Sequence, residues 1–295
     1  MKEPLERYLA SRRASVDDVL QRLISSSVEW PEHLHRAIRY SLFPGGRRLH
    51  AILAIGGYEA VAAVPDLSTV LPIAAAIEMI TVSVQVHDDL PALHDRDSRD
   101  GLPTNHRVHG EALSILAGDA LRALAFQVLT DRSHYPAGTD PVVLLDVARS
   151  LAAATGEEGV VGSQSASLGY EGEIKAAEHL AFLFAKRTGG LMRSAILAGA
   201  RVAGVTEEGR RALATFGDRL GLAHSLVEDL VQNGDSGDEP GRPRTRPSIV
   251  ELIGARATRD WIGRAVDEAM AAIHSFDTRC DGLRAIAREV SSREV

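Results

Sequence analysis

The sequence predicts an all-α fold, a large bundle of helices, and three observations indicate it. Apolar residues recur at the three- and four-residue spacing of amphipathic helices, whereas the alternating pattern of strands is hard to find. The breaks between these stretches are short and contain Gly, Pro or Asp. The chain has 295 residues, of which 45% are hydrophobic, so it can bury a large core.

The expected helices follow one another along the chain. An amphipathic helix is expected at residues 5–23, and a stretch rich in Ala, Leu and Ile follows at 49–63. Residues 68–90 are apolar almost all round, which is typical of a buried central helix. The same spacing predicts further helices at residues 112–130, 141–154, 176–199, 207–231 and 257–273. Because there is no internal repeat or long linker, we expect one domain over residues 1–295.

Composition narrows the class of protein. The formal net charge of -7 and the pI near 5.9 argue against a nucleic-acid partner, which would need a basic face. Cys280 is the only cysteine, so a reducing compartment fits. The N-terminal residues are charged and amphipathic, unlike a secretory signal, and no uncharged apolar stretch reaches about 18 residues. We therefore expect a cytoplasmic protein without a membrane span.

Two acidic pairs end apolar helices. Asp88 and Asp89 lie in "VHDDLPALHDRDSRDG", at the end of the expected central helix, and Glu228 and Asp229 lie in "LGLAHSLVEDL". The helix dipole disfavours anions at a C-terminus, so each pair needs a compensating cation, and oxygen ligands suit Mg²⁺. From spacing alone, a two-sided metal clamp and two solvated helix ends both stay open.

Basic residues supply the other half of a possible site. Arg47 and Arg48 follow a glycine pair, and Lys186 and Arg187 come just before another. Arg99 and Arg107 lie just downstream of the first acids. Guanidinium groups together with metal ions are the usual means of holding a diphosphate. Acids and bases at the ends of apolar helices predict a ligand with a diphosphate on a hydrophobic tail.

Together these stretches resemble the trans-isoprenyl diphosphate synthase (polyprenyl synthetase) family over about residues 34–247. The order also fits the family: "GGRRL", the first acid motif, "GSQ", "RTGGL", the second acid motif and "RTRP". The resemblance implies a single-domain, isoprenoid-synthase-type helix bundle around a deep apolar cavity, a homodimer, and three Mg²⁺ ions. It also implies a reaction in which an allylic diphosphate is ionised and the carbocation is attacked by isopentenyl diphosphate.

Carried over residue by residue, the resemblance gives four catalytic and metal-binding acids: Asp88, Asp89, Glu228 and Asp229. Glu228 and Gln232 stand where the family has aspartates. His94 occupies the place of the last aspartate of the first motif. Asp95 is added as a metal ligand, because it would share a face with Asp88 if the helix continued past Pro91.

The resemblance also implies residues that bind the substrate. Arg99 matches the first arginine of a pair, Gln164 matches the glutamine of "GGQ", and Arg187 and Thr188 match the family's Lys-Thr. Ser225 stands where the family has a glutamine before the second acid motif. The full set of substrate-binding candidates is Arg47, Arg48, Arg99, Gln164, Lys186, Arg187, Thr188 and Ser225.

The expected site for isopentenyl diphosphate departs most from the family. Arg47 and His50 replace its lysine and last arginine, Thr81 replaces its histidine, and Asp100 replaces the second arginine of the pair. Each charge-assisted hydrogen bond to a diphosphate is worth about 1.5–3 kcal/mol. We therefore expect this site to be weakened while the ionisation site persists in altered form.

These departures favour a Mg-dependent class I enzyme that ionises an allylic prenyl diphosphate and cyclises or rearranges it without isopentenyl diphosphate, like a terpene synthase. The small residues Ser83 and Val84, just before the first acids, favour a C15 or C20 substrate. One alternative is a conventional prenyltransferase that makes farnesyl, geranylgeranyl or polyprenyl diphosphate. The other is a catalytically silent partner subunit.

Overall fold

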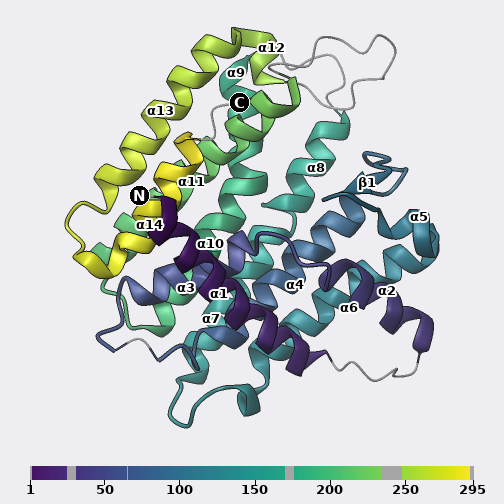
Figure 1. Ribbon diagram of the computed structural model, residues 1–295, viewed down its shortest axis with the longest axis horizontal. Coiled ribbons are helices and arrows are strands. Elements are labelled where there is room, and N and C mark those ends of the chain that lie inside the picture. The colour runs from purple at the N-terminus through teal and green to yellow at the C-terminus, as the bar shows by residue number, and fades with distance from the viewer. Residues whose placement is uncertain (1, 25–30, 65, 170–175, 234–247, 293–295) are drawn as a thin grey trace. The chain divides into compact units, whose positions relative to one another are not determined.

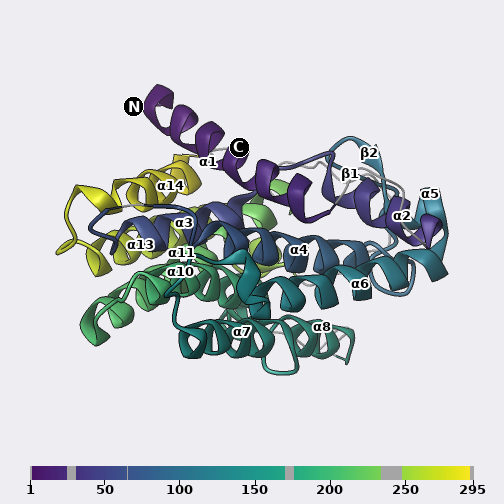
Figure 2. The ribbon, with the colours of Figure 1, turned by 90° about the horizontal axis from the view of Figure 1, so that it is seen from below.

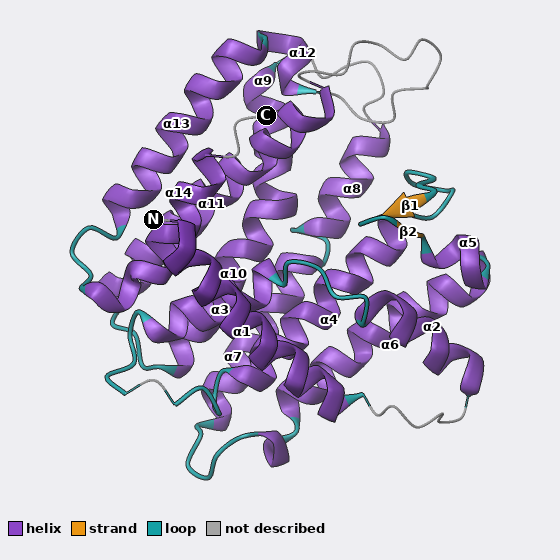
Figure 3. Cartoon of the chain, in the orientation of Figure 1, coloured by secondary structure: helices purple, strands orange, loops and turns teal. Residues whose placement is uncertain are grey.

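The computed structural model describes residues 2–24, 31–64, 66–169, 176–233 and 248–292, and these are almost entirely helical (Figures 1 and 3). The predicted all-α fold is therefore confirmed. The strands of the described part are two residues each, β1 (Ser98–Arg99) and β2 (Leu102–Pro103), and they form one antiparallel hairpin. The stretch "GDSGDEPGRPRTRP", at 234–247, lies outside the described residues.

The chain divides into two compact units. Unit 1 comprises Met1–Ile55 and Val64–Ala148, and unit 2 comprises Gly56–Ala63 and Arg149–Val295. Two helices, α3 (Leu49–Glu59) and α7 (Pro141–Thr155), run from one unit into the other. One domain over residues 1–295 stays a prediction from the sequence.

Unit 1 is built around α4 (Leu71–Asp88), the expected central helix. Its other helices are α1 (Lys2–Leu23), α2 (Glu32–Leu42), α5 (Asn105–His109), α6 (Glu111–Thr130) and η1 (Arg132–His134). In Figure 2, α4 and α6 lie side by side, and α1 and α2 also contact α4. Pro72 lies in the first turn of α4, where its missing N–H breaks no hydrogen bond. Most of α4 is buried, because its own side chains are apolar on all faces of the helix.

Unit 2 centres on α11 (Glu207–Asn233), which lies against α10 (Gly190–Val202) and α13 (Ala255–Ala272) (Figure 1). Its other elements are α8 (Val160–Gly169), α9 (Ala177–Phe184), the π-helical turn η2 (Ala185–Gly189), α12 (Ile249–Ile253), η3 (Thr278–Cys280) and α14 (Asp281–Ser292). A Cβ added to Gly221 would lie 2.2 Å from Cα of Gly189. The absence of a side chain at Gly221 thus allows η2 and α11 to meet backbone to backbone.

The expected helices match the structure except at 176–199, which is a single stretch in the sequence but α9, η2 and α10 in the structure. The π-helical turn between them is a feature often found at functional sites.

Among the described helices, α6 is long and apolar enough to cross a membrane by length and composition, and 39% of its apolar stretch is buried. That is weak evidence for a span, because core helices of soluble proteins meet the same criterion.

Candidate active site

The first acid pair marks the end of α4. Asp88 is its last residue and Asp89 its C-cap, and they are only 8% and 4% exposed. Two nitrogens of Arg99, Nε and Nη2, donate to the two carboxylate oxygens of Asp89 at 2.8 and 2.6 Å. Such a two-pronged pair is among the stronger ionic contacts in proteins. The cation required by the acids at this helix end is thus partly supplied by β1.

The hairpin holds Arg99 in place. Arg99 pairs with Leu102, and the turn between them contains Asp100 and Gly101 at φ +50° and +81°. Asp-Gly is a favoured sequence for a two-residue turn in which both residues have positive φ. Burial disfavours the charge of Arg99, but its hydrogen bonds to Asp89 and the nearby acids outweigh burial and raise its pKa. Arg99 therefore stays charged beside the first acid pair.

His94 has a local structural role. Its Nδ1 lies 2.9 Å from the main-chain carbonyl oxygen of Asp88, which can only accept a hydrogen bond, so Nδ1 carries the proton. A histidine that donates to the last carbonyl groups of a helix stabilises that helix end. The residue that replaces the last aspartate of the motif thus caps α4.

The geometric reason given for Asp95 as a metal ligand is wrong. It required the helix to continue past Pro91, but α4 ends at Asp88, and Asp95 has φ +43°. One oxygen of its carboxylate accepts a hydrogen bond from Arg107 at 3.0 Å. Asp95 as a ligand therefore stays a prediction without the support of a shared helix face.

The adjacent arginines of "GGRRLH" lie in opposite environments. Arg47 is exposed, whereas Arg48 is 2% exposed and has φ +52°. The guanidinium of Arg48 donates to Asp17 at 2.9 Å, to Glu78 at 3.0 Å and to the carbonyl of Leu42 at 2.6 Å. The sequence assigned both arginines to the diphosphate. The three contacts of Arg48 tie the glycine loop to α1 and α4, and its role towards the diphosphate stays a prediction.

The pKa of Glu78 is raised, because burial disfavours its charge more strongly than Arg48 favours it. One of its oxygens, Oε2, is buried and has no hydrogen-bond partner in the described part of the chain. A buried carboxylate with one satisfied oxygen depends on its single cation. Removing Arg48 would therefore leave a buried acid uncompensated.

A small cavity of about 120 Å³ adjoins the first acid pair within unit 1. Gly45 and Gly46 line it from the glycine loop, Asp89 from α4, and Arg99 and Asp100 from the hairpin. Pockets that enclose small ligands usually measure about 300–1,000 Å³, so this cavity can hold only part of a prenyl diphosphate. It nevertheless gathers the glycine loop, the first acids and the hairpin around one space.

The second acid pair is held differently. Glu228 is exposed, whereas Asp229 is 7% exposed. Oδ2 of Asp229 accepts hydrogen bonds from the hydroxyl of Ser248 and the backbone N–H of Val250, both at 3.0 Å. The sequence analysis did not identify Ser248. The signal for it is "SIVE", a serine followed three residues later by glutamate, which is typical of a helix N-terminus.

In unit 2 the structure brings three groups of predicted substrate-binding residues onto contacting elements. Lys186, Arg187 and Thr188 lie in η2. This turn contacts two helices: α8 carries Gln164, and α11 carries Ser225. Lys186 is exposed, and its amine lies 5.6 Å from the ring centre of Phe182. The hydroxyl of Ser225 donates to the carbonyl of Gly221 at 3.0 Å, so it faces its own helix backbone.

The donors available for a metal are hard carboxylate oxygens, which suit Mg²⁺. Among the described residues, no three His, Cys, Asp or Glu side chains are gathered in a group that could hold a metal ion. Mg²⁺ usually keeps several waters and binds through one or two carboxylates together with substrate phosphates. The acids at the ends of α4 and α11 therefore fit Mg²⁺ that arrives with a diphosphate.

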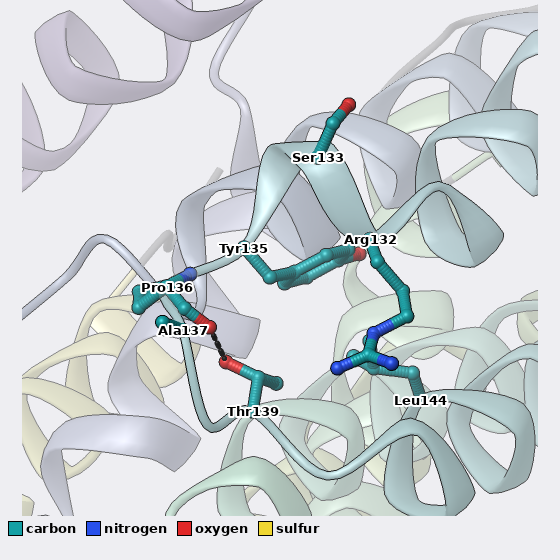
Figure 4. Close-up of a pocket in the computed structure, with 7 residues that line it drawn as sticks. All are labelled: Arg132, Ser133, Tyr135, Pro136, Ala137, Thr139 and Leu144. Atoms are coloured by element: carbon teal, nitrogen blue, oxygen red, sulfur yellow. Dashed lines mark hydrogen bonds between the residues drawn. The ribbon is translucent and has the colours of Figure 1, made fainter.

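A larger cavity of unit 1, about 380 Å³, lies elsewhere, where α6 connects to α7 (Figure 4). Arg132, Tyr135, Thr139 and Leu144 are among its lining residues, and the hydroxyl of Thr139 donates to the carbonyl of Pro136 at 2.9 Å. Burial raises the pKa of Tyr135. This cavity contains no predicted site residue, so its size alone does not mark the active site.

Comparison with known proteins agrees with the order of the motifs. The family model "Polyprenyl synthetase" matches residues 31–244. Farnesyl diphosphate synthase of Geobacillus stearothermophilus is 32% identical over 98% of both chains. Geranylgeranyl diphosphate synthase of Cyanophora paradoxa is 32% identical over 97% of this chain and 95% of the other.

A solved structure supports the same conclusion. The FPP/GFPP synthase of Zymomonas mobilis is 29% identical, with a TM-score of 0.88 over 99% of this chain and 100% of the other. Similarity of this extent covers both acid motifs and the stretches between them. The chain therefore belongs to the polyprenyl synthetase family, and the prediction of an enzyme that uses isoprenyl diphosphates, a transferase or a lyase, is confirmed, with the comparisons supporting the transferase.

Proposed function

We propose that this protein is a chain-elongating prenyltransferase that joins isopentenyl diphosphate to an allylic prenyl diphosphate. The observation that supports it most is the similarity to a farnesyl diphosphate synthase over 98% of both chains. The sequence alone favoured cyclisation without isopentenyl diphosphate, and the comparisons support the alternative better. A homodimer and a cytoplasmic location belong to the proposal as expectations from the family resemblance.

The hairpin gives a structural reason for the departure that weighed most against elongation. Asp100 occupies the first of two turn positions with positive φ, where aspartate is favoured over most other residues. The aspartate is thus explained by the turn and does not require loss of the acceptor substrate. Arg47 is exposed and directly follows Gly46, which lines the cavity beside the first acid pair, so it still offers a cation.

In the proposed reaction, the acids and bases at the helix ends bind the allylic diphosphate. Bound Mg²⁺ would supply positive charge to the leaving diphosphate. Asp88, Asp89, Glu228 and Asp229 would hold that metal, while Arg99 would stabilise the developing charge on the diphosphate. Apolar side chains would keep water from the allylic carbocation until the double bond of isopentenyl diphosphate attacks it. The new carbon–carbon bond leaves a second carbocation, which loses a proton to the released diphosphate and so regains a double bond.

The test is product analysis with Mg²⁺ and geranyl, farnesyl or geranylgeranyl diphosphate, each with and without isopentenyl diphosphate. The proposal expects elongated diphosphates, formed only when isopentenyl diphosphate is present. Cyclic or rearranged hydrocarbons formed without it would overturn the proposal in favour of a terpene-synthase-like enzyme. No product, together with no Mg²⁺-dependent binding of an unreactive allylic analogue, would favour the silent partner subunit.

Asp100→Asn sharpens this test at the acceptor site. Asparagine tolerates the positive φ of the turn, so the variant removes the negative charge and keeps the hairpin. We expect the KM for isopentenyl diphosphate to fall several-fold, because one like charge near the acceptor diphosphate is removed. An unchanged KM would mean that Asp100 does not face this substrate.

A further inference from the structure

We infer that Ser248 is a positioning residue for the second acid motif: its hydroxyl holds the carboxylate of Asp229 in the orientation in which that carboxylate serves Mg²⁺ and the diphosphate. This inference rests on the proposed function, because it assigns Ser248 a role only through Asp229. It adds a residue that lies 19 positions after the acid it positions.

The geometry around Ser248 leaves its hydroxyl little freedom. Ser248 is 2% exposed and is the N-cap of α12. Its hydroxyl oxygen accepts the backbone N–H of Glu251 at 3.3 Å, and its hydrogen is donated to Oδ2 of Asp229 at 3.0 Å. One side chain therefore begins α12 and binds the acid at the same time.

Asp229 is fixed by two donors at one oxygen. Besides Ser248, the backbone N–H of Val250 donates to Oδ2, so both donors come from the first residues of α12. Both of these donors are neutral, so what they contribute is the orientation of the carboxylate.

Ser248 differs in charge from Arg99, the residue that contacts Asp89 in the first acid motif. Arg99 would compete with a cation for Asp89, whereas Ser248 has no charge with which to compete for Asp229. Groups that orient a metal-binding carboxylate typically change metal affinity or activity by about 10–100-fold when they are removed. We therefore expect Ser248 to affect Mg²⁺ affinity more than it affects folding.

The experiment measures binding of a farnesyl diphosphate analogue whose bridging oxygen is sulfur, titrated with Mg²⁺ in a calorimeter. Ser248→Ala removes the donor, and Ser248→Thr keeps a hydroxyl. We expect Ser248→Ala to need about tenfold more Mg²⁺ for half-maximal binding, and Ser248→Thr to stay within about twofold of the natural protein.

Thr258→Val is the matched control. Thr258 is fully buried in α13, and its hydroxyl donates to the carbonyl of Gly254 at 3.0 Å rather than to an acid. This variant also removes a buried hydroxyl from the same part of unit 2, so any loss of melting temperature can be matched. Its Mg²⁺ requirement should equal that of the natural protein.

Two results would overturn the inference. One is a folded Ser248→Ala protein that binds the analogue at the natural Mg²⁺ concentration, and the other is an equal shift in Thr258→Val. If Ser248→Ala does not fold, Ser248→Gly replaces it, because glycine is well tolerated at an N-cap and also lacks the donor. Failure of the natural protein itself to bind the analogue would count against the proposed function instead.

Discussion

The acid pairs at the ends of α4 and α11 are held by opposite means. Asp89 of the first pair meets a guanidinium at both carboxylate oxygens, whereas Asp229 of the second meets two neutral donors at a single oxygen. Asp88 is buried, while Glu228 is exposed. The first pair thus receives a positive charge from Arg99, whereas Ser248 and Val250 bring no charge to Asp229. Similar sequence patterns at two helix ends therefore have different electrostatic roles.

The largest expected effect on stability is at Arg48, which contacts Glu78 of α4, the helix that ends in the first acid pair. Arg48→Ala breaks a buried ion pair and leaves Glu78 without its cation, so the free energy of unfolding should fall by about 3–5 kcal/mol. Chemical denaturation measures this. Arg47→Ala is the matched control, because its side chain is exposed, and it should leave stability nearly unchanged. Equal losses in the two variants would contradict the structural role of Arg48.

Two glycines, Gly118 in unit 1 and Gly221 in unit 2, differ in what an added methyl group would contact. In Gly221→Ala the new Cβ meets Cα of Gly189 at 2.2 Å, so two backbones must separate. In Gly118→Ala it meets the His87 ring at 2.2 Å, and a side chain can turn away. Overpacking typically costs about 1–3 kcal/mol, so we expect the free energy of unfolding to fall more in Gly221→Ala. A larger loss in Gly118→Ala would show that α4 and α6 are the more rigid pair.

Replacing Asp89 and Asp229 by asparagine tests directly whether the two acids differ in the charge of their partners. Asp89→Asn removes the charge that Arg99 binds, and a hydrogen bond to a charged group contributes about 1.5–3 kcal/mol. Asp229→Asn keeps an oxygen acceptor for Ser248 and Val250 and removes no ion pair with either of them, so we expect the smaller loss there. Thermal unfolding at neutral pH measures both. Equal losses would mean that charge does not distinguish the two pairs, although both variants should lose activity.

The smallest effect is expected at the start of α11. Hydrogen bonds from Arg210 and Arg211 lower the pKa of Glu207 from its ordinary value of 4.5 to about 2. Because the folded pKa is lowered, the stabilisation is present above pH 4.5 and is lost as the pH falls towards 2. Glu207→Gln should lower the melting temperature slightly at neutral pH and not near pH 2. Since Glu207 is exposed, added salt should remove the difference.

Local patterns were sufficient to predict the longest helices, because each depends on the spacing of apolar residues within one segment, whereas the shorter α2, α8 and α14 were not expected. The central helix was expected at 68–90 and is α4 at Leu71–Asp88. The region 176–199 was expected as one helix, but close packing of Gly189 against α11 accompanies a π-helical turn there. This packing involves α11, which is distant in the sequence, so the apolar spacing within the segment could not indicate it.

By itself, the sequence determined the helical class, the order of the motifs and the positions of the two acid pairs, because these depend on residues close together in the chain. Only the tertiary structure decided the partners of those acids. It placed Arg48 inside with Asp17 and Glu78, and it brought Ser248 to Asp229 across 19 residues. Two adjacent arginines look alike in a sequence, and only the contacts made by segments distant in the chain decide which of them is buried.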